Sequence, residues 1–172
     1  PTRRSSDLVP AAEMTDGDFV TDSIRLPQLS DGKYSRGVVG LVTGSARYPG
    51  AAVLSATAAA RANTGMVRYL GPQRAQDMVL SSLPEAVIGK GRVQSWVVGS
   101  GVPTGDDEAA DTDIQRETIT ALLKHYALQE KTGSNDDARN ESALGMPPIV
   151  VDAGALDLLP GKVPAQVVVT PH

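Results

Sequence analysis

VVGLVTGSARYPGAAVLSATAAARANTG, residues 38–65, is the stretch that decides the fold. Its first six residues are apolar and rich in β-branched side chains, which predicts a buried strand. A glycine-containing turn follows at 44–50, and an alanine-rich helix is then expected from Ala51 to about Asn63, ended by Gly65. This order leaves backbone N–H groups and the positive end of a helix dipole where an anion could bind.

Composition narrows the class of protein. The chain has 172 residues, of which 41% are apolar and only 3% aromatic, so one domain with an aliphatic core is expected. The net charge of −4 gives no reason to expect nucleic acid or an anionic membrane as a partner, and no apolar run is long enough to span a bilayer. The absence of cysteine excludes disulfides and thiol catalysis and fits a cytoplasmic location.

The rest of the chain alternates between strand and helix patterns. Residues 1–29 are expected to form an N-terminal arm with a short helix, capped by Thr15 and running through Ile24. Residues 30–172 are expected to form one domain, in which the polar segment 130–145 is a flexible surface loop. The further expected elements are strands at 66–70, 85–88, 96–98, 148–151 and 166–170, helices at 74–82 and 114–129, and a helical turn at 153–159. This alternation predicts an α/β fold, a three-layer α/β/α arrangement around a mostly parallel sheet.

Four strand exits carry residues that strand formation does not require. Right-handed crossovers place the carboxyl ends of parallel strands along one edge, where ligands bind in such folds. The exits are Gly44-Ser45, Gly99-Ser100-Gly101, Asp152 and Thr170-Pro171-His172. The first turn is neither a P-loop, because no Lys-Ser/Thr follows its glycines, nor a dinucleotide fingerprint, because the glycine spacing differs.

Each exit also has a purely structural interpretation. The turns at 44–50 and 99–101 could simply allow close packing of helix on sheet. Asp152 could cap the helical turn at 153, a role that we favour slightly over ligand binding, and His172 could be solvated. His125 is expected to be exposed, and two separated histidines without cysteine predict no metal site. The acidic run at 106–113 is interpreted as a solvated helix start.

Taken together, the exits resemble a known family. The matching motifs are Lys33 to Gly37, Thr43-Gly44-Ser45, Tyr48 to Ala52, Arg61 to Gly65, Val98-Gly99-Ser100-Gly101, Val151 to Leu156, and Val169-Thr170-Pro171-His172. They resemble the ADP/ATP-dependent NAD(P)H-hydrate dehydratases, which are carbohydrate-kinase-like enzymes with the ribokinase-like fold. Ser100 stands where the family's Gly-Pro-Gly signature has proline. The last four residues resemble the start of its Thr-Pro-His-Pro-Gly-Glu signature.

The resemblance implies a function and a site. The family repairs hydrated NADH and NADPH by phosphorylating the ring hydroxyl with ADP or ATP and Mg²⁺, and then eliminating phosphate. It implies substrate-binding roles for Gly44, Ser45, Ala51, Gly101, Asp152 and His172, and a homo-oligomer, often a tetramer. The family's catalytic Asp, in a Gly-x-Asp segment, and its ADP-binding loop match positions beyond His172. The chain therefore resembles the N-terminal portion of the domain, and these residues alone are expected to bind weakly without turnover.

Two other functions stay open at this point. The first is a different ribokinase-like enzyme, such as a small-molecule kinase, which would share the sheet and the rim of strand exits. The second is a non-catalytic nucleotide-binding domain, which Ser100 and the unmatched catalytic Asp leave possible.

Overall fold

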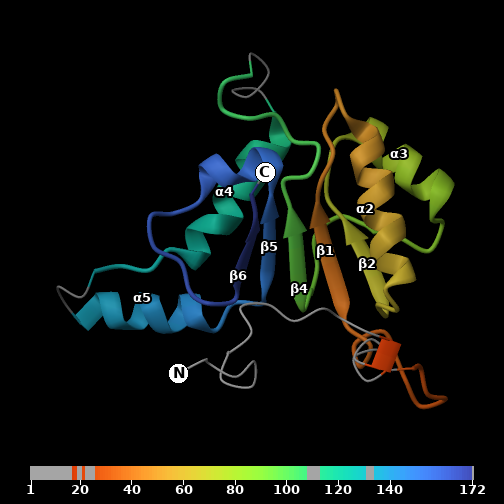
Figure 1. Cartoon of the computed structure of the whole chain (residues 1–172), viewed down its shortest axis with the longest axis horizontal. Coiled ribbons are helices and arrows are strands. Elements are labelled where there is room, and N and C mark those ends of the chain that lie inside the picture. The colour runs from red at the N-terminus through yellow and green to blue at the C-terminus, as the bar shows by residue number, and fades with distance from the viewer. Residues whose placement is uncertain (1–16, 19–20, 22–25, 108–112, 131–133, 172) are drawn as a thin grey trace, which may run out of the picture.

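A computed structural model describes residues 17, 18, 21, 26–107, 113–130 and 134–171. Six parallel strands form one sheet in the order β3-β2-β1-β4-β5-β6, as Figure 1 shows. The strands are β1 (Val38–Val42), β2 (Met66–Tyr69), β3 (Val87–Ile88), β4 (Ser95–Val98), β5 (Ile149–Asp152) and β6 (Val167–Thr170). The expected parallel α/β sheet is therefore confirmed, and the strand from the deciding stretch lies at its centre.

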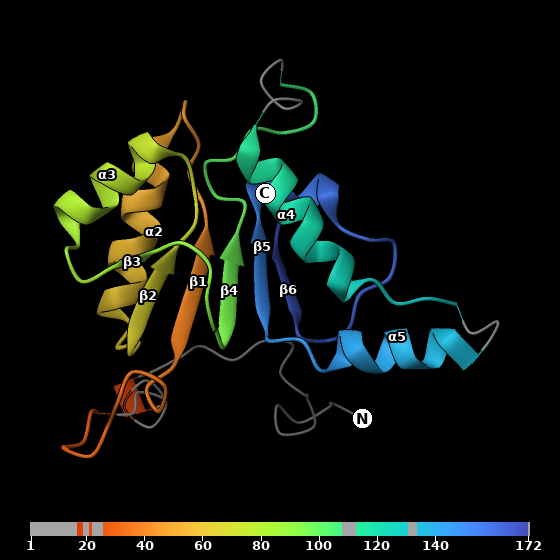
Figure 2. The same ribbon diagram turned by 180° about the vertical axis from the view of Figure 1, so that it is seen from behind.

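The helices cover opposite faces of the two halves of the sheet. Figure 1 shows α2 (Pro49–Arg61) and α3 (Gln73–Ser82) on one face, beside β1 and β2. Figure 2 shows α4 (Ile114–Leu123) on the other face, over β5 and β6. The α2–α3 pair therefore leaves the β5–β6 half of its face less covered, and α4 leaves the β1–β2 half of the other face less covered. Both large hollows described below lie in those quarters.

The side chains of β1 alternate between two hydrophobic cores. Every residue of β1 is buried, as expected for a central strand between two helical layers. Leu41 packs in a core with Ala52 and Ala56 of α2, whereas its neighbour Val42 packs in the core on the α4 side with Ile119. The alanines of α2 keep that helix close to the sheet, because a small side chain permits a short distance between the two backbones.

The interpretation of 130–145 as a flexible loop is wrong, because Ser134–Leu144 forms helix α5. The helix has acidic residues in its first turn, where negative charge stabilises a helix. Its second half is held by two other segments of the chain. The Asn140 side chain exchanges hydrogen bonds with the backbone of Gln129, and the Gln166 side-chain amide donates to the carbonyls of Ala143 and Leu144. These contacts compensate for a segment whose composition is weakly helical.

The helix expected at 114–129 is shorter than the pattern indicates. It ends at Leu123, and a 3₁₀ turn, η3 (Lys124–Tyr126), follows. The buried Tyr126 hydroxyl donates to the Pro147 carbonyl at 2.7 Å, and burial raises the pKa of Tyr126 to about 12. The tyrosine therefore stays a neutral donor that fixes the end of the helix against the start of β5.

Two expectations about the N-terminal segment are not tested by the described residues. The helix expected through Ile24 lies largely outside the described residues, and the boundary at residue 30 stays a prediction. In the described ranges, no helix combines the length and apolar character needed to cross a bilayer.

Candidate functional site

The strand exits chosen from the sequence lie together at one edge of the sheet. The backbone N–H of Gly44 donates to the carbonyl of Ser100 at 2.7 Å, which joins the turn after β1 to the turn after β4. On the other side of β4, Asp152 at the end of β5 is in register with Thr170 at the end of β6. His172 lies outside the described residues. The described exits therefore form one continuous rim.

Glycine lets the first two turns approach each other. Gly44 and Gly101 have φ of +69° and +70°, a region that glycine occupies without strain. A Cβ at Gly101 would overlap the Cβ of Ala51 and lie 3.3 Å from the Gly44 Cα. Gly44, Ala51 and Gly101 are thus in direct contact and present backbone rather than long side chains.

Ser45 shapes the turn that leads into α2. It is 1% exposed, and its hydroxyl accepts a hydrogen bond from the backbone N–H of Tyr48 at 3.0 Å. No side chain caps α2, and no acidic residue lies in its first turn. The positive end of the α2 dipole is therefore not compensated by a described side chain and points at the rim.

Asp152 does not have the capping role that we favoured for it. It precedes the 3₁₀ helix η4 (Ala153–Leu158), but its side chain makes no capping hydrogen bond. Instead, its carboxylate accepts a hydrogen bond from the Thr170 hydroxyl at 2.7 Å. Asp152 is only half-buried, so one carboxylate oxygen is held by Thr170 while the group remains accessible to a ligand.

A hollow of about 560 Å³ opens beneath this rim on the α2 face of the sheet. Ser100, Asp152 and Thr170 line its rim, and Val97 and Val150 contribute side chains from the sheet. Its remaining wall is the small-residue face of α2, formed by Ser55, Ala58, Ala59 and Ala62. The sequence left open what this face contacts. Ala52 and Ala56 pack on the sheet, whereas the residues that line the hollow leave space beside it.

A buried hydrogen-bond network supports the first turn from below. The Thr43 carbonyl accepts from the Tyr69 hydroxyl at 2.8 Å and from the Gln115 amide at 3.1 Å, and Gln115 also donates to the Leu70 carbonyl. Burial and the negative charge of Asp113 both raise the pKa of Tyr69, so its hydroxyl remains protonated. The roles of Tyr69 and Gln115 were not predicted, because each occupies an ordinary strand or helix position and no local pattern marks a distant carbonyl partner.

Removing the Tyr69 hydroxyl should cost little stability. Tyr69→Phe is expected to lower the free energy of unfolding by about 1 kcal/mol, because Gln115 still satisfies the Thr43 carbonyl. Urea denaturation followed by circular dichroism measures this change. Tyr48→Phe is the control, since Tyr48 is 46% exposed. A loss above about 3 kcal/mol for Tyr69→Phe would show that the two donors do not share the carbonyl.

A second network holds the turn after β4 against η4. Arg116 of α4 donates to the carbonyls of Pro103 and Gly154 at 2.8 and 2.9 Å and forms a bidentate ion pair with Asp157 at 3.1 and 3.0 Å. The Gly105 N–H donates to the same carboxylate at 2.7 Å. We call these five residues the Arg116 clamp, and it links the strand exits of β4 and β5 through one guanidinium.

No group of three or more histidine or acidic side chains that could hold a metal occurs among the described residues. Asp113 of the acidic run caps α4 by accepting from the backbone N–H groups of Gln115 and Arg116, so this part of the run is a helix start, as expected. His125 is exposed, also as expected.

A family model described as NAD(P)H-hydrate dehydratase matches residues 39–172, a range that includes β2 to β6, all of β1 except Val38, and the whole described rim. The chain belongs to this family. The family resemblance carried by the strand exits is thereby confirmed.

Curated relatives of this dehydratase family are bifunctional NAD(P)H-hydrate repair enzymes. The chain is 51% identical to the Corynebacterium glutamicum enzyme over 84 residues, which is 46% of this chain and 14% of that enzyme. It is 42% identical to the Mycobacterium tuberculosis enzyme over 118 residues, which is 60% of this chain and 24% of that enzyme. The chain thus spans about a quarter or less of these two relatives.

Solved structures confirm the ribokinase-like fold. A ribokinase-like superfamily protein from Enterococcus faecalis matches with a TM-score of 0.67 and 19% identity, over 92% of this chain and 53% of that chain. An ADP/ATP-dependent NAD(P)H-hydrate dehydratase from Bacillus subtilis, co-crystallised with ATP and Mg²⁺, matches with a TM-score of 0.60 and 19% identity, over 90% of this chain and 51% of that chain. The chain therefore corresponds to about half of the fold in these structures.

Proposed function

We propose that the polypeptide carrying this chain dehydrates hydrated NADH and NADPH, with ADP or ATP as phosphoryl donor. The observation that carries the proposal is the contact between the family's motifs at one rim. Gly44 is hydrogen-bonded to Ser100, and Gly101 lies against Ala51. The reaction transfers a phosphoryl group to the ring hydroxyl and then eliminates phosphate with a ring proton, which restores the double bond of the reduced nicotinamide.

The described residues suit substrate binding at this rim. Gly44, Ala51 and Gly101 allow a dinucleotide to lie against backbone, near the uncapped end of α2, which favours an anionic pyrophosphate. We propose that Asp152, oriented by Thr170, accepts a hydrogen bond from a substrate hydroxyl, and that Ser45 holds the turn in shape. His172 keeps its proposed substrate-binding role as a prediction from the sequence.

Nucleotide and metal are not assigned to residues of this chain. The Bacillus subtilis neighbour was co-crystallised with ATP and Mg²⁺, which supports their use in the family reaction. The described residues contain no cluster of three ligands suited to a metal. We propose that the catalytic base and the nucleotide loop belong to the rest of the polypeptide. A cytoplasmic homo-tetramer is proposed on the family resemblance, and sedimentation velocity tests the tetramer.

The activity is tested by the return of NADH absorbance from its purified hydrate with ADP or ATP. Release of free phosphate in step with NADH supports dehydration, whereas a stable phosphorylated product would assign a small-molecule kinase. The absence of both products, together with no stabilisation by NADPH or ADP in a thermal shift measurement, would favour a non-catalytic domain.

Asp152→Ala should lower kcat/KM about tenfold, mainly by raising KM, because it removes one charged hydrogen-bond acceptor for the substrate. Steady-state kinetics with NADPH hydrate measures the change. Asp77→Ala is the control, since the Asp77 carboxylate accepts a hydrogen bond from Gln73 on the exposed face of α3 and does not line the rim hollow. An unchanged KM for Asp152→Ala would remove Asp152 from the proposed site.

A further inference from the structure

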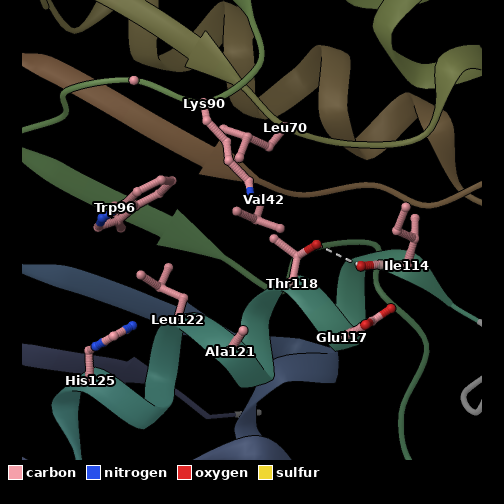
Figure 3. A pocket seen from close by; sticks show the side chains of 11 residues that line it. Val42, Leu70, Lys90, Trp96, Ile114, Glu117, Thr118, Ala121, Leu122 and His125 are labelled. Carbon is pink, nitrogen blue, oxygen red and sulfur yellow. Dashed lines mark hydrogen bonds between the residues drawn. The ribbon is translucent and has the colours of Figure 1, made fainter.

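A second hollow, of about 630 Å³, lies between α4 and the segment that joins β3 to β4. Its floor is apolar and is formed by Val42, Leu70, Trp96 and Leu122, as Figure 3 shows. Val42 and Trp96 point to the face opposite the one that carries the rim hollow, because side chains alternate along a strand. The volume and the mostly apolar lining fall in the range of sites for small organic molecules.

Trp96 provides a flat surface on this floor. In the sheet it is in register with Gly40 of β1, and a Cβ at Gly40 would overlap the indole ring. The glycine therefore allows the ring to lie across the central strand. Trp96 is the sole tryptophan among the 172 residues, and its indole N–H has no hydrogen-bond partner among the described residues. The ring is only half-buried, so it has a surface and a donor available to a ligand.

Positive charge lies at the opposite wall. The Arg68 guanidinium on β2 donates to the carbonyls of Gly89 and Lys90 at 3.0 and 3.1 Å, and a Cβ at Gly91 would overlap it. This contact holds the segment against the sheet, and Figure 3 shows the Lys90 side chain pointing into the hollow toward Val42. Lys90 is exposed and has no ion-pair partner in the part of the chain that the structure describes.

The lining of the hollow holds one lysine, Lys90, and one carboxylate, Glu117 on α4. Glu117 and His125 line it and are both exposed, and the Thr118 hydroxyl already donates to the Ile114 carbonyl at 2.8 Å. Arg68 does not line the hollow, but it adjoins Gly91 and adds positive charge beside the wall that carries Lys90. An anionic group is therefore the complement of this wall, and a flat apolar group is the complement of Trp96.

We propose that this hollow binds a planar aromatic molecule that carries one carboxylate or phosphate group. Its ring would lie against Trp96 and Leu122, and its anionic group beside Lys90. The site is separate from the rim and does not depend on the function proposed for the rim.

The Trp96 indole N–H gives a direct measurement of binding. In a ¹H–¹⁵N NMR spectrum it is the indole cross-peak that Trp96→Phe removes. Titration with 2-naphthoate should shift this peak to saturation, and the neutral 2-naphthamide should bind about fivefold more weakly. Adenosine 5′-monophosphate tests phosphate as the anionic group: tighter binding than 2-naphthoate identifies a phosphorylated ligand, and the reverse order identifies a carboxylate.

Variants separate the two walls of the hollow. Lys90→Gln should weaken 2-naphthoate to the affinity of 2-naphthamide and leave 2-naphthamide unchanged. Ala121 of α4 also lines the hollow, so Ala121→Phe should fill it and weaken both. Lys162→Gln is the matched control, because Lys162 is an exposed lysine paired with Glu130 and does not line this hollow.

Three results would overturn the proposal. The first is an indole peak that none of the probes shifts at millimolar concentration. The second is equal binding of 2-naphthoate and 2-naphthamide. The third is an indole peak that moves with protein concentration alone while sedimentation shows a dimer, because a second copy of the chain would then cover the hollow.

Discussion

Gly99→Ala should lower the free energy of unfolding by about 3 kcal/mol or more, the largest effect of any single methyl group that we expect in this chain. Gly99 has a φ of +105°, a backbone angle that residues with a Cβ rarely adopt. A Cβ there would also overlap the backbone oxygen of Asp152 and lie close to the Ala155 Cβ. Neither neighbour is the flexible end of a side chain, so the overlap can be relieved only if the exits of β4 and β5 separate.

Gly161→Ala is the matched control for this change. A Cβ added at Gly161 would have no atom within 4 Å, and Gly161 has no positive φ. Alanine there should therefore change the free energy of unfolding by no more than about 0.5 kcal/mol. Urea unfolding of both variants, followed by circular dichroism, measures the difference. Equal stability of Gly99→Ala and the parent protein would show that the rim tolerates separation, and the close contact between these exits would then lose its importance for the site.

The location of the rim could be predicted because it depends on local patterns. Short apolar runs followed by glycine or Asp152 fix where strands end, and the topology rule for parallel strands then places those ends together. The roles of individual residues at the rim could be predicted less well. The side chain of Asp152 turned out to accept from Thr170 rather than cap η4, and the choice depends on β6, which lies far along the chain.

The wrong prediction for residues 130–145 and the missed role of Arg116 have the same physical origin. Helix α5 has a polar sequence and forms where Asn140 bonds to the backbone of Gln129 and where Gln166 bonds to the end of the helix. Arg116 has the pattern of an ordinary helix surface residue, yet its partners are two loops that follow different strands. Periodicity records which face of a helix is apolar, but it carries no information about which distant carbonyl a polar side chain will meet.

Arg116→Met should lower the free energy of unfolding by about 2 kcal/mol, because it leaves the carbonyls of Pro103 and Gly154 without this donor. Methionine keeps much of the apolar stem, so the loss reflects hydrogen bonds and charge more than packing. The Arg116 side chain is 13% exposed, but that of Asp157 is 42% exposed, so solvent screens the ion pair and the two carbonyl bonds should dominate. The measurement is urea denaturation at neutral pH.

The pH dependence of that difference isolates the ionic part of the Arg116 clamp. Burial acts to raise the pKa of Asp157, but hydrogen bonds from Arg116 and Gly105 and the charge of Arg116 outweigh it and hold the pKa below its ordinary value. A lowered pKa in the folded state contributes stability above the unfolded pKa of about 4, and that stability is lost as the pH falls through the lower folded pKa. The gap between the parent protein and Arg116→Met should therefore be largest near neutral pH and narrow in acid.

Arg47→Met tests whether any arginine–aspartate pair at this edge behaves in the same way. The pair of Arg47 with Asp107 has an N–O distance of 3.1 Å, but the Arg47 side chain is 62% exposed, so its loss should change stability by no more than about 0.5 kcal/mol. A gap for Arg116→Met that stays constant with pH would show that the carbonyl bonds alone carry the clamp. Equal effects of the two substitutions on stability would show that water can replace the interactions of Arg116. The turn after β4 would then be positioned by Gly99 and the sheet.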